Sequence, residues 1–280
     1  MSSAFVRLLL AVALALAAPS ARAQHGVADV VYVPTPQVVV DAMLRMGNVG
    51  PDDYLIDLGS GDGRVVVTAA KQAGARALGV ELDKYLLNQA RENAAKAGVA
   101  ERAQFRDQNL FETDLSQATV ITTYLLPEMN VKLRPKILAL KPGTRVVAHD
   151  YHMGDWLPDL REDLSVPEKK VGNAGVSYVY LWYVPARAEG VWRGTAGDQP
   201  LELALKQRYQ FVTGVARPGK DAVEIEGGRL KGEEIKFFLK TGGVRREFVG
   251  RVTPGEMTGR VTTVRGGKPV QEKWQVKIAG

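Results

Sequence analysis

A glycine-rich run is the part of the sequence best suited to chemistry. It reads Asp57-Leu58-Gly59-Ser60-Gly61-Asp62-Gly63-Arg64 and follows the apolar segment Tyr54-Leu55-Ile56. Its three glycines allow a tight turn, let the backbone approach a ligand, and open a helix whose N-terminal amides favour negative groups. A dinucleotide fingerprint needs its third glycine at position 64, where this chain has arginine. Asp57 suits instead an amino-acid moiety, whose ammonium group it could hold directly or through water.

The run resembles motif I of class I S-adenosylmethionine (SAM)-dependent methyltransferases. The resemblance implies that Glu81, 18 residues past Gly63, accepts both ribose hydroxyls, a task that suits a carboxylate. It implies that Asp107 contacts the adenine amino group and that residues 108–111 form the adjacent wall. SAM is therefore the expected cofactor. Its expected contacts are Asp57, Gly59, Ser60, Gly61, Gly63, Glu81, Leu82, Asp107, Gln108 and Asn109.

A narrower resemblance covers residues 32–157, about half of the chain. This segment is similar to the protein-lysine methyltransferase family that includes the mitochondrial ATP synthase c-subunit lysine methyltransferases. More distantly, residues 57–63 are similar to the non-SET histone-lysine methyltransferases. Besides the glycine run, four segments carry the narrower resemblance: Tyr32-Val33-Pro34-Thr35-Pro36, Gly79-Val80-Glu81-Leu82, Leu126-Pro127-Glu128-Met129 and Gly154-Asp155-Trp156.

Residues on the acceptor side are harder to assign. Methyl transfer mainly requires that the nucleophile is aligned with the methyl group and sulfur, and a lysine acceptor must also lose a proton. No catalytic dyad is required, so the catalytic residues remain unassigned. Ligands of open α/β sheets lie beyond the carboxyl ends of strands, which makes Tyr124, Pro127 and Glu128 candidates. The alternative interpretation places Tyr124 in the core and makes Pro127 the first residue of a helix. The chain lacks the Asn/Asp-Pro-Pro-Tyr signature of methyltransferases acting on nucleobases and glutamine amides.

A polar run, His149-Asp150-Tyr151-His152, follows the fifth strand and has Asp155 nearby. Two histidines and two aspartates within seven residues could bind a metal or give the acceptor a base. The other interpretation is a polar loop at the mouth of the active site. We favour the loop because no further set of ligands is visible, and so expect no metal. His149 and Asp150 stay candidates on the acceptor side, and Trp156 is expected to be a packing residue.

The elements that must position these residues alternate between short β-branched runs and helical stretches, which predicts an α/β fold with a Rossmann-like sheet of seven strands. Expected helices span residues 65–72, 84–96 and 131–140. Expected strands span 54–57, 77–81, 103–106, 119–126, 144–148, 164–171 and 176–184.

After Arg187 the pattern changes to period two. Leu201, Leu203 and Leu205 alternate with polar or small residues, and glycine pairs such as Gly242-Gly243 separate similar runs. About eight short strands predict a small antiparallel barrel or sandwich, with Trp192, Trp274 and Phe248 in its core. The expected domains are residues 24–187 and 188–280.

The first 23 residues predict a cleaved signal peptide. Arg7 gives a positive start, residues 8–18 are uninterruptedly apolar, and Ala21-Arg22-Ala23 places small residues at a cleavage site. The apolar run is short for a transmembrane helix, so we expect no transmembrane span in the mature chain. The expected location is periplasmic or secreted, and cytoplasmic if this interpretation is wrong.

Charge is unevenly divided along the 280 residues, which carry a net charge of +6 and no cysteine. Residues 24–189 hold 18 Lys and Arg against 21 Asp and Glu, a net of −3, whereas residues 190–280 hold 17 against 10, a net of +7. The lack of cysteine excludes disulfides and thiolate chemistry. The basic C-terminal part suits an anionic surface or an acidic partner, and no nucleic-acid motif accompanies it.

The function predicted from these features is SAM-dependent methyl transfer, with a protein lysine as the expected acceptor. One alternative is an exported, non-catalytic protein that binds ligands in a methyltransferase-like pocket, since SAM is made in the cytoplasm. Another is a methyltransferase that acts on RNA or on a small molecule. An aromatic and basic RNA-binding motif would favour RNA, and the sequence shows none.

Overall fold

The structure is a computed structural model that describes residues 32–219, 221–265 and 267–279. The predicted signal peptide, residues 1–23, lies outside these ranges. Among the described helices, none is long and apolar enough to cross a bilayer.

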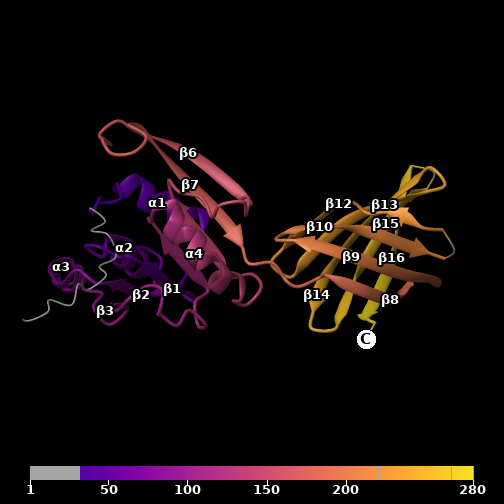
Figure 1. The fold of residues 1–280 in the computed structure, drawn as a ribbon, viewed down its shortest axis with the longest axis horizontal. Coiled ribbons are helices and arrows are strands. Elements are labelled where there is room, and N and C mark those ends of the chain that lie inside the picture. Colours follow the sequence, from indigo (N-terminus) through magenta and orange to yellow (C-terminus); the bar gives the residue numbers. More distant parts are fainter. Residues whose placement is uncertain (1–31, 220, 266, 280) are drawn as a thin grey trace, which may run out of the picture. The chain divides into compact units, whose positions relative to one another are not determined.

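A mixed sheet of seven strands organises the first part of the chain (Figure 1). The strand order is β3-β2-β1-β4-β5-β7-β6, in which β1 to β5 are parallel and β7 runs antiparallel to both β5 and β6. This order confirms the predicted Rossmann-like sheet. The strands are β1 (Tyr54–Leu58), β2 (Arg76–Glu81), β3 (Ala103–Asp107), β4 (Val120–Thr123), β5 (Arg145–His149), β6 (Leu160–Val166) and β7 (Gly175–Tyr183).

Helices cover both faces of this sheet, as alternation along the strands requires. One apolar cluster joins α1 (Gln37–Met46), α2 (Arg64–Gln72) and α3 (Lys84–Lys96) to one face of the sheet. A second cluster joins α4 (Pro127–Leu138) to the opposite face. In β1, Leu55 belongs to the first cluster and Ile56 to the second. Both faces of the central strands are therefore buried, which explains their nearly continuous apolar sequences.

Three predicted elements have different boundaries in the structure. The strand expected over residues 119–126 ends at Thr123, and the helix expected from residue 131 begins at Pro127. Proline is favoured at this first helical position because no intrahelical partner is lost there. The strand expected over 164–171 instead spans Leu160–Val166. It ends before Pro167, which has no backbone N–H to continue the ladder.

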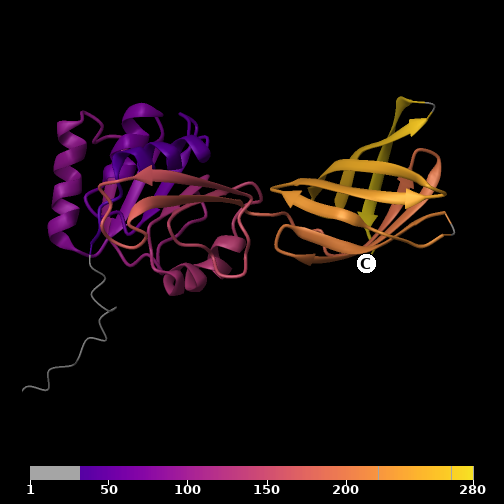
Figure 2. The ribbon, with the colours of Figure 1, turned by 90° about the horizontal axis from the view of Figure 1, so that it is seen from above.

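The C-terminal strands form a closed antiparallel barrel, and Figure 2 shows its strands curving around one core. Eight strands close the ring because β9 pairs with β10, and the two-residue β11 (Val223–Glu224) adds to β10 alone. Trp192, Phe248 and Trp274 are buried inside, as predicted. The eight are β8 (Gly190–Ala196), β9 (Gln199–Arg208), β10 (Phe211–Pro218), β12 (Glu226–Lys231), β13 (Glu234–Thr241), β14 (Val244–Thr253), β15 (Glu256–Arg265) and β16 (Lys268–Ile278).

Candidate functional site

The glycine turn connects β1 to α2 at the carboxyl end of the sheet. Gly59, Gly61 and Gly63 have φ angles of 77°, 53° and 79°, a region that other residues rarely adopt. The backbone N–H groups of Gly59 and Ser60 both donate to the carbonyl of Val80 in β2, at 3.0 Å each. The turn is thus fastened to the neighbouring strand, and its geometry explains why glycines occupy these three positions.

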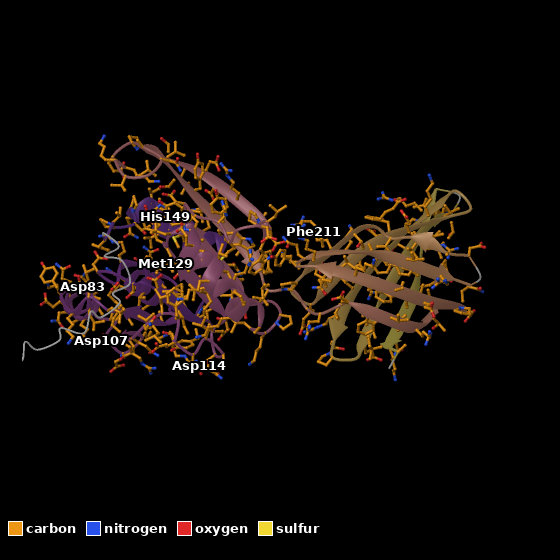
Figure 3. All side chains as sticks on the ribbon, in the orientation of Figure 1. Asp83, Asp107, Asp114, Met129, His149 and Phe211 are labelled. Atoms are coloured by element: carbon orange, nitrogen blue, oxygen red, sulfur yellow. The ribbon has the colours of Figure 1, made fainter. Side chains whose placement is uncertain are left out.

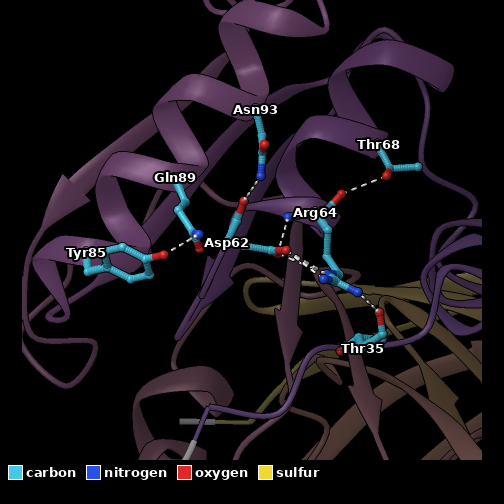
Figure 4. A network of polar contacts seen from close by, with 7 residues as sticks. All are labelled: Thr35, Asp62, Arg64, Thr68, Tyr85, Gln89 and Asn93. Atoms are coloured by element: carbon cyan, nitrogen blue, oxygen red, sulfur yellow. Dashed lines mark hydrogen bonds and ion pairs between the residues drawn. The ribbon is translucent and has the colours of Figure 1, made fainter.

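Polar contacts hold the turn from two further sides (Figure 4). The guanidinium of Arg64 forms an ion pair with Asp62 at 2.6 Å and donates to the carbonyl of Thr35 at 2.8 Å. The amide of Asn93 in α3 donates to the carbonyl of Asp62 at 2.9 Å. The segment before α1 and the helix α3 therefore fix the position of the turn.

Glu81 ends β2, as predicted, and its carboxylate contacts the glycine turn. Its Oε2 accepts the N–H of Gly61 at 3.0 Å, and its Oε1 accepts the N–H groups of Leu82 and Asp83 at 2.8 and 3.0 Å. Each carboxylate oxygen has two lone pairs, so these three backbone donors leave one acceptor site, on Oε2, for a hydroxyl. The backbone amides orient the carboxylate.

The predicted adenine-side residues lie beside Glu81. Asp107, labelled in Figure 3, ends β3 directly opposite Glu81 in the parallel register and is exposed. Leu82 is 52% exposed, which is unusual for leucine and leaves an apolar surface next to the two carboxylates. The backbone N–H of Gln108 donates to the carbonyl of Glu81 at 3.3 Å. The side chain of Asn109 accepts the N–H of Phe111 at 3.0 Å, a turn-forming role.

Asp57 is buried at the end of β1, where its carboxylate accepts a 2.6 Å hydrogen bond from the hydroxyl of Thr122. Burial raises the pKa of Asp57 to about 7; the hydrogen bond from Thr122 opposes this shift, and the charges of Glu81 and Asp62 add to it. A buried carboxyl with such a pKa is ready to ionise when a cation arrives.

The affinity for SAM is expected to depend on pH through Asp57. Below pH 7 the carboxyl is neutral, so binding an ammonium group requires release of a proton. Affinity should therefore fall by up to about tenfold for each pH unit below 7. Calorimetric titrations between about pH 5.5 and pH 7.5 measure this, since free α-amino groups lose their own proton near pH 7.7–8.0. Asp57→Asn should bind more weakly without this slope, and a slope kept in that variant would contradict the assignment.

The acceptor-side candidates meet at the carboxyl ends of β4 and β5. Tyr124 follows β4 and is partly buried, with its ring centroid 3.9 Å from that of His149 and 6.0 Å from that of Tyr151. Pro127 is the first residue of α4, as the alternative interpretation predicted, and Glu128 is exposed in the first turn of that helix. Tyr124 is thus a wall residue next to solvent, whereas Leu125 is core.

The polar run after β5 divides among different partners. His149, labelled in Figure 3, is fully buried between the hydroxyls of Ser177 and Thr35, at 3.0 and 3.3 Å from its two ring nitrogens. Burial lowers its pKa to about 4, with the nearby charges of Asp150 and Lys169 acting in opposite directions. His149 is therefore neutral near pH 7, and its ring packs against that of Tyr124. Among the residues that the structure describes, no three His, Cys, Asp or Glu gather as metal ligands.

Asp150 has φ +61° and forms a buried ion pair with Lys169. Sequence reasoning did not assign Lys169, Thr35 or Ser177 to the site. These residues lie 19 to 114 positions from their partners, and no local motif pairs them. Only the fold brings them to the site.

The residues present fit SAM. Within the described ranges, the buried hydroxyls of Ser60 and Thr123 have no hydrogen-bond partner, although buried polar groups are normally paired. Ser60 lies in the glycine turn, and Thr123 ends β4 beside Leu58. Two carboxylates that would accept from hydroxyl and amino donors, an apolar surface, and a buried carboxyl that would hold an ammonium group match the chemical groups of the cofactor.

Comparisons with known proteins agree with this geometry. The profile of the ANTKMT methyltransferase domain matches residues 57–160. A protein-lysine N-methyltransferase of Saccharolobus islandicus is 43% identical over 155 residues, which make up 55% of this chain and 95% of that protein. The ATP synthase c-subunit lysine N-methyltransferase of Mus musculus is 36% identical over 131 residues, 46% of this chain. The chain spans about half (51%) of the mouse protein.

Among solved structures, the RNA methyltransferase of Salinibacter ruber in complex with S-adenosyl-L-homocysteine is 49% identical. The alignment covers 55% of this chain and 95% of that chain, with a TM-score of 0.51. The bound molecule is the product that SAM leaves after giving up its methyl group.

Proposed function

Because the chain belongs to the ANTKMT methyltransferase domain family of class I SAM-dependent methyltransferases, we propose that it methylates the ε-amino group of a lysine in a protein. The observation that carries this proposal is the 43% identity to a protein-lysine N-methyltransferase over 95% of that protein's length. The 36% identical mouse relative is also a lysine N-methyltransferase.

The residues of the cofactor half would bind and orient SAM, which supplies an activated methyl group. Glu81 and Asp107 offer carboxylates to the ribose and adenine, and Asp57 offers one to the ammonium group. The glycine turn places backbone N–H groups beside them. Such fixed contacts accelerate transfer mainly by alignment.

The acceptor half would orient the lysine. The ring of Tyr124 is held by His149, whose nitrogens are both occupied by hydroxyl partners. Burial and the charge of Asp150 raise the pKa of Tyr124 far above neutral pH, so its phenol stays protonated. The ring of Tyr124 offers an apolar surface on which the aliphatic stem of a lysine side chain can pack.

The test is the product of methyl transfer. The purified protein, given SAM with an isotopically labelled methyl group and mixed proteins as acceptors, should place the label in ε-N-methyllysine after complete hydrolysis. Gly61→Arg is the matched control, because its side chain would fill the glycine turn. Label in any other amino acid alone would contradict the lysine proposal.

RNA is the second candidate acceptor, because the Salinibacter ruber structure is described as an RNA methyltransferase and is 49% identical. RNA supplied in the same reaction separates the two candidates. Label in nucleosides with none in protein would assign RNA. We favour lysine because both curated relatives named above act on it.

We also propose that residues 1–23 are a cleaved signal peptide, so that methylation takes place outside the cytoplasm. The support is the positive, apolar and small-residue pattern of the sequence. Mass spectrometry of the protein isolated from its natural source should find a chain that begins at Gln24. A chain that retains Met1 would contradict the proposal.

For the barrel we propose an acidic partner or an anionic surface. Its strands place like charges opposite each other, as in the exposed pair Arg260 and Lys273 of β15 and β16. Directly opposed like charges are destabilising unless an anion comes between them. The affinity of the protein for anionic vesicles or for an acidic protein should fall as salt is added. An affinity that does not change with salt concentration would contradict the proposal.

A further inference from the structure

The acceptor side of the site contains an ion pair in which both side chains are buried. Lys169, in the segment between β6 and β7, places its Nζ 2.5 Å from Oδ2 of Asp150 and 2.7 Å from the carbonyl oxygen of Val176. The side chains are 4% and 2% exposed. Burying two charges costs desolvation that their attraction often fails to recover, so stability alone is a weak reason for such a pair.

Both carboxylate oxygens of Asp150 have polar groups beside them. Its Oδ1 accepts the backbone N–H of Tyr178 in β7 at 3.0 Å and lies 3.5 Å from Nε2 of His149. Its Oδ2 accepts from Lys169 and lies 3.5 Å from the hydroxyl of Tyr124. Lys169 is the cation among these groups, since His149 is neutral near pH 7 and Tyr124 stays protonated.

The position of the pair gives it a chemical consequence. Asp150 directly follows β5 and has a left-handed φ, and Tyr124 directly follows β4. The ion pair of Asp150 and Lys169 therefore lies beside the ring of Tyr124, at the carboxyl ends of both strands. In open α/β sheets ligands bind at this end. An acceptor lysine must lose a proton there before it can react, and a carboxylate without a partner would stabilise its ammonium form.

We propose that Lys169 is a positioning residue that neutralises Asp150, so that the acceptor lysine is bound as the free amine. This inference rests on the proposed lysine acceptor. The ammonium proton passes to solvent first. The amine nitrogen then forms its bond to the methyl carbon as the carbon–sulfur bond breaks, and that electron pair goes to sulfur. Lys169 touches none of the reacting atoms and acts through Asp150.

Lys169→Met leaves the carboxylate of Asp150 unpaired and should favour the ammonium form of the acceptor. With poly-L-lysine at saturating concentration as the probe, the acidic limb of kcat, which reports groups in the enzyme–substrate complex, should move up by about one pH unit. This shift lowers the rate near pH 7 about tenfold, and the rate recovers at high pH. Asp150→Asn leaves Lys169 charged and should move the limb the opposite way. The double variant has neither charge and should return the limb to its original position.

Lys170→Met is the matched control, because Lys170 is the exposed neighbour of Lys169 and should leave the profile unchanged. Thermal unfolding and SAM titration of every variant identify those that fail to fold. A rate lowered by the same factor at all pH values would show a purely structural role. A shift that persists in the double variant would also overturn the inference.

A binding readout separates this inference from the proposed function. n-Butylamine mimics the lysine side chain, and its affinity for the complex with S-adenosylhomocysteine can be titrated without catalysis. At pH 6, where the probe is a cation, Lys169→Met should bind it about tenfold more tightly than the original protein does. Equal affinity overturns the inference. Absence of methyllysine in the labelling assay overturns the proposed acceptor, and the binding readout still decides the role of Lys169.

Discussion

Replacement of Glu81 by alanine is expected to weaken SAM binding by about 1 to 3 kcal/mol, or roughly 5- to 150-fold, the usual loss for charge-assisted hydrogen bonds. Two effects contribute. The ribose loses its carboxylate, and the N–H groups of Gly61, Leu82 and Asp83 lose the acceptor that orders them. Calorimetric titration of SAM and S-adenosylhomocysteine measures the change.

The controls for Glu81 separate charge from shape. Glu81→Gln keeps the size and one acceptor oxygen, so it should fall between the original protein and Glu81→Ala. Glu101→Ala removes an exposed carboxylate outside the site and should leave affinity unchanged. Unchanged affinity in a folded Glu81→Ala protein would remove Glu81 from the cofactor site.

Gly63→Ala is expected to lower the free energy of unfolding by about 2 to 4 kcal/mol. Its φ of +79° already disfavours a side chain, and a Cβ there would lie 2.6 Å from Cζ of Phe105 and 2.8 Å from Cβ of Ala90. Phe105 is buried in the apolar cluster and Ala90 belongs to α3, so neither can move away without a loss of packing. Urea unfolding monitored by circular dichroism gives the value.

Gly98→Ala is the matched control for Gly63. Its φ of +70° is similar, but a Cβ there meets no atom within 4 Å. It should therefore show only the backbone cost, about 1 kcal/mol. If the two variants lose equal stability, the close packing of Gly63 against Phe105 and Ala90 is not what requires glycine.

Much of the cofactor half could be predicted because its signals are local. The glycine spacing specifies a turn that only glycine adopts easily, and parallel pairing of successive strands brings Glu81 and Asp107 to adjacent positions. The acceptor half could not be predicted in the same way. Lys169 and Asp150 meet because β6 and β7 form a hairpin beside β5, and no spacing along the chain encodes that contact.

The C-terminal strands show a second limit. Period-two alternation predicted which residues face inward, and Trp192, Phe248 and Trp274 are buried accordingly. It did not distinguish a barrel from a sandwich, because both bury alternate residues. The distinction depends on closure, here the pairing of β9 with β10 together with that of β8 with β16.

That closure also orders the events of folding. The seven strands of the N-terminal sheet all lie before residue 184, so this sheet can form without the barrel strands. The barrel must wait, because its first strand, β8, pairs with its last, β16. Until β16 pairs with β8, the hairpin of β8 and β9 exposes an edge that other chains could join.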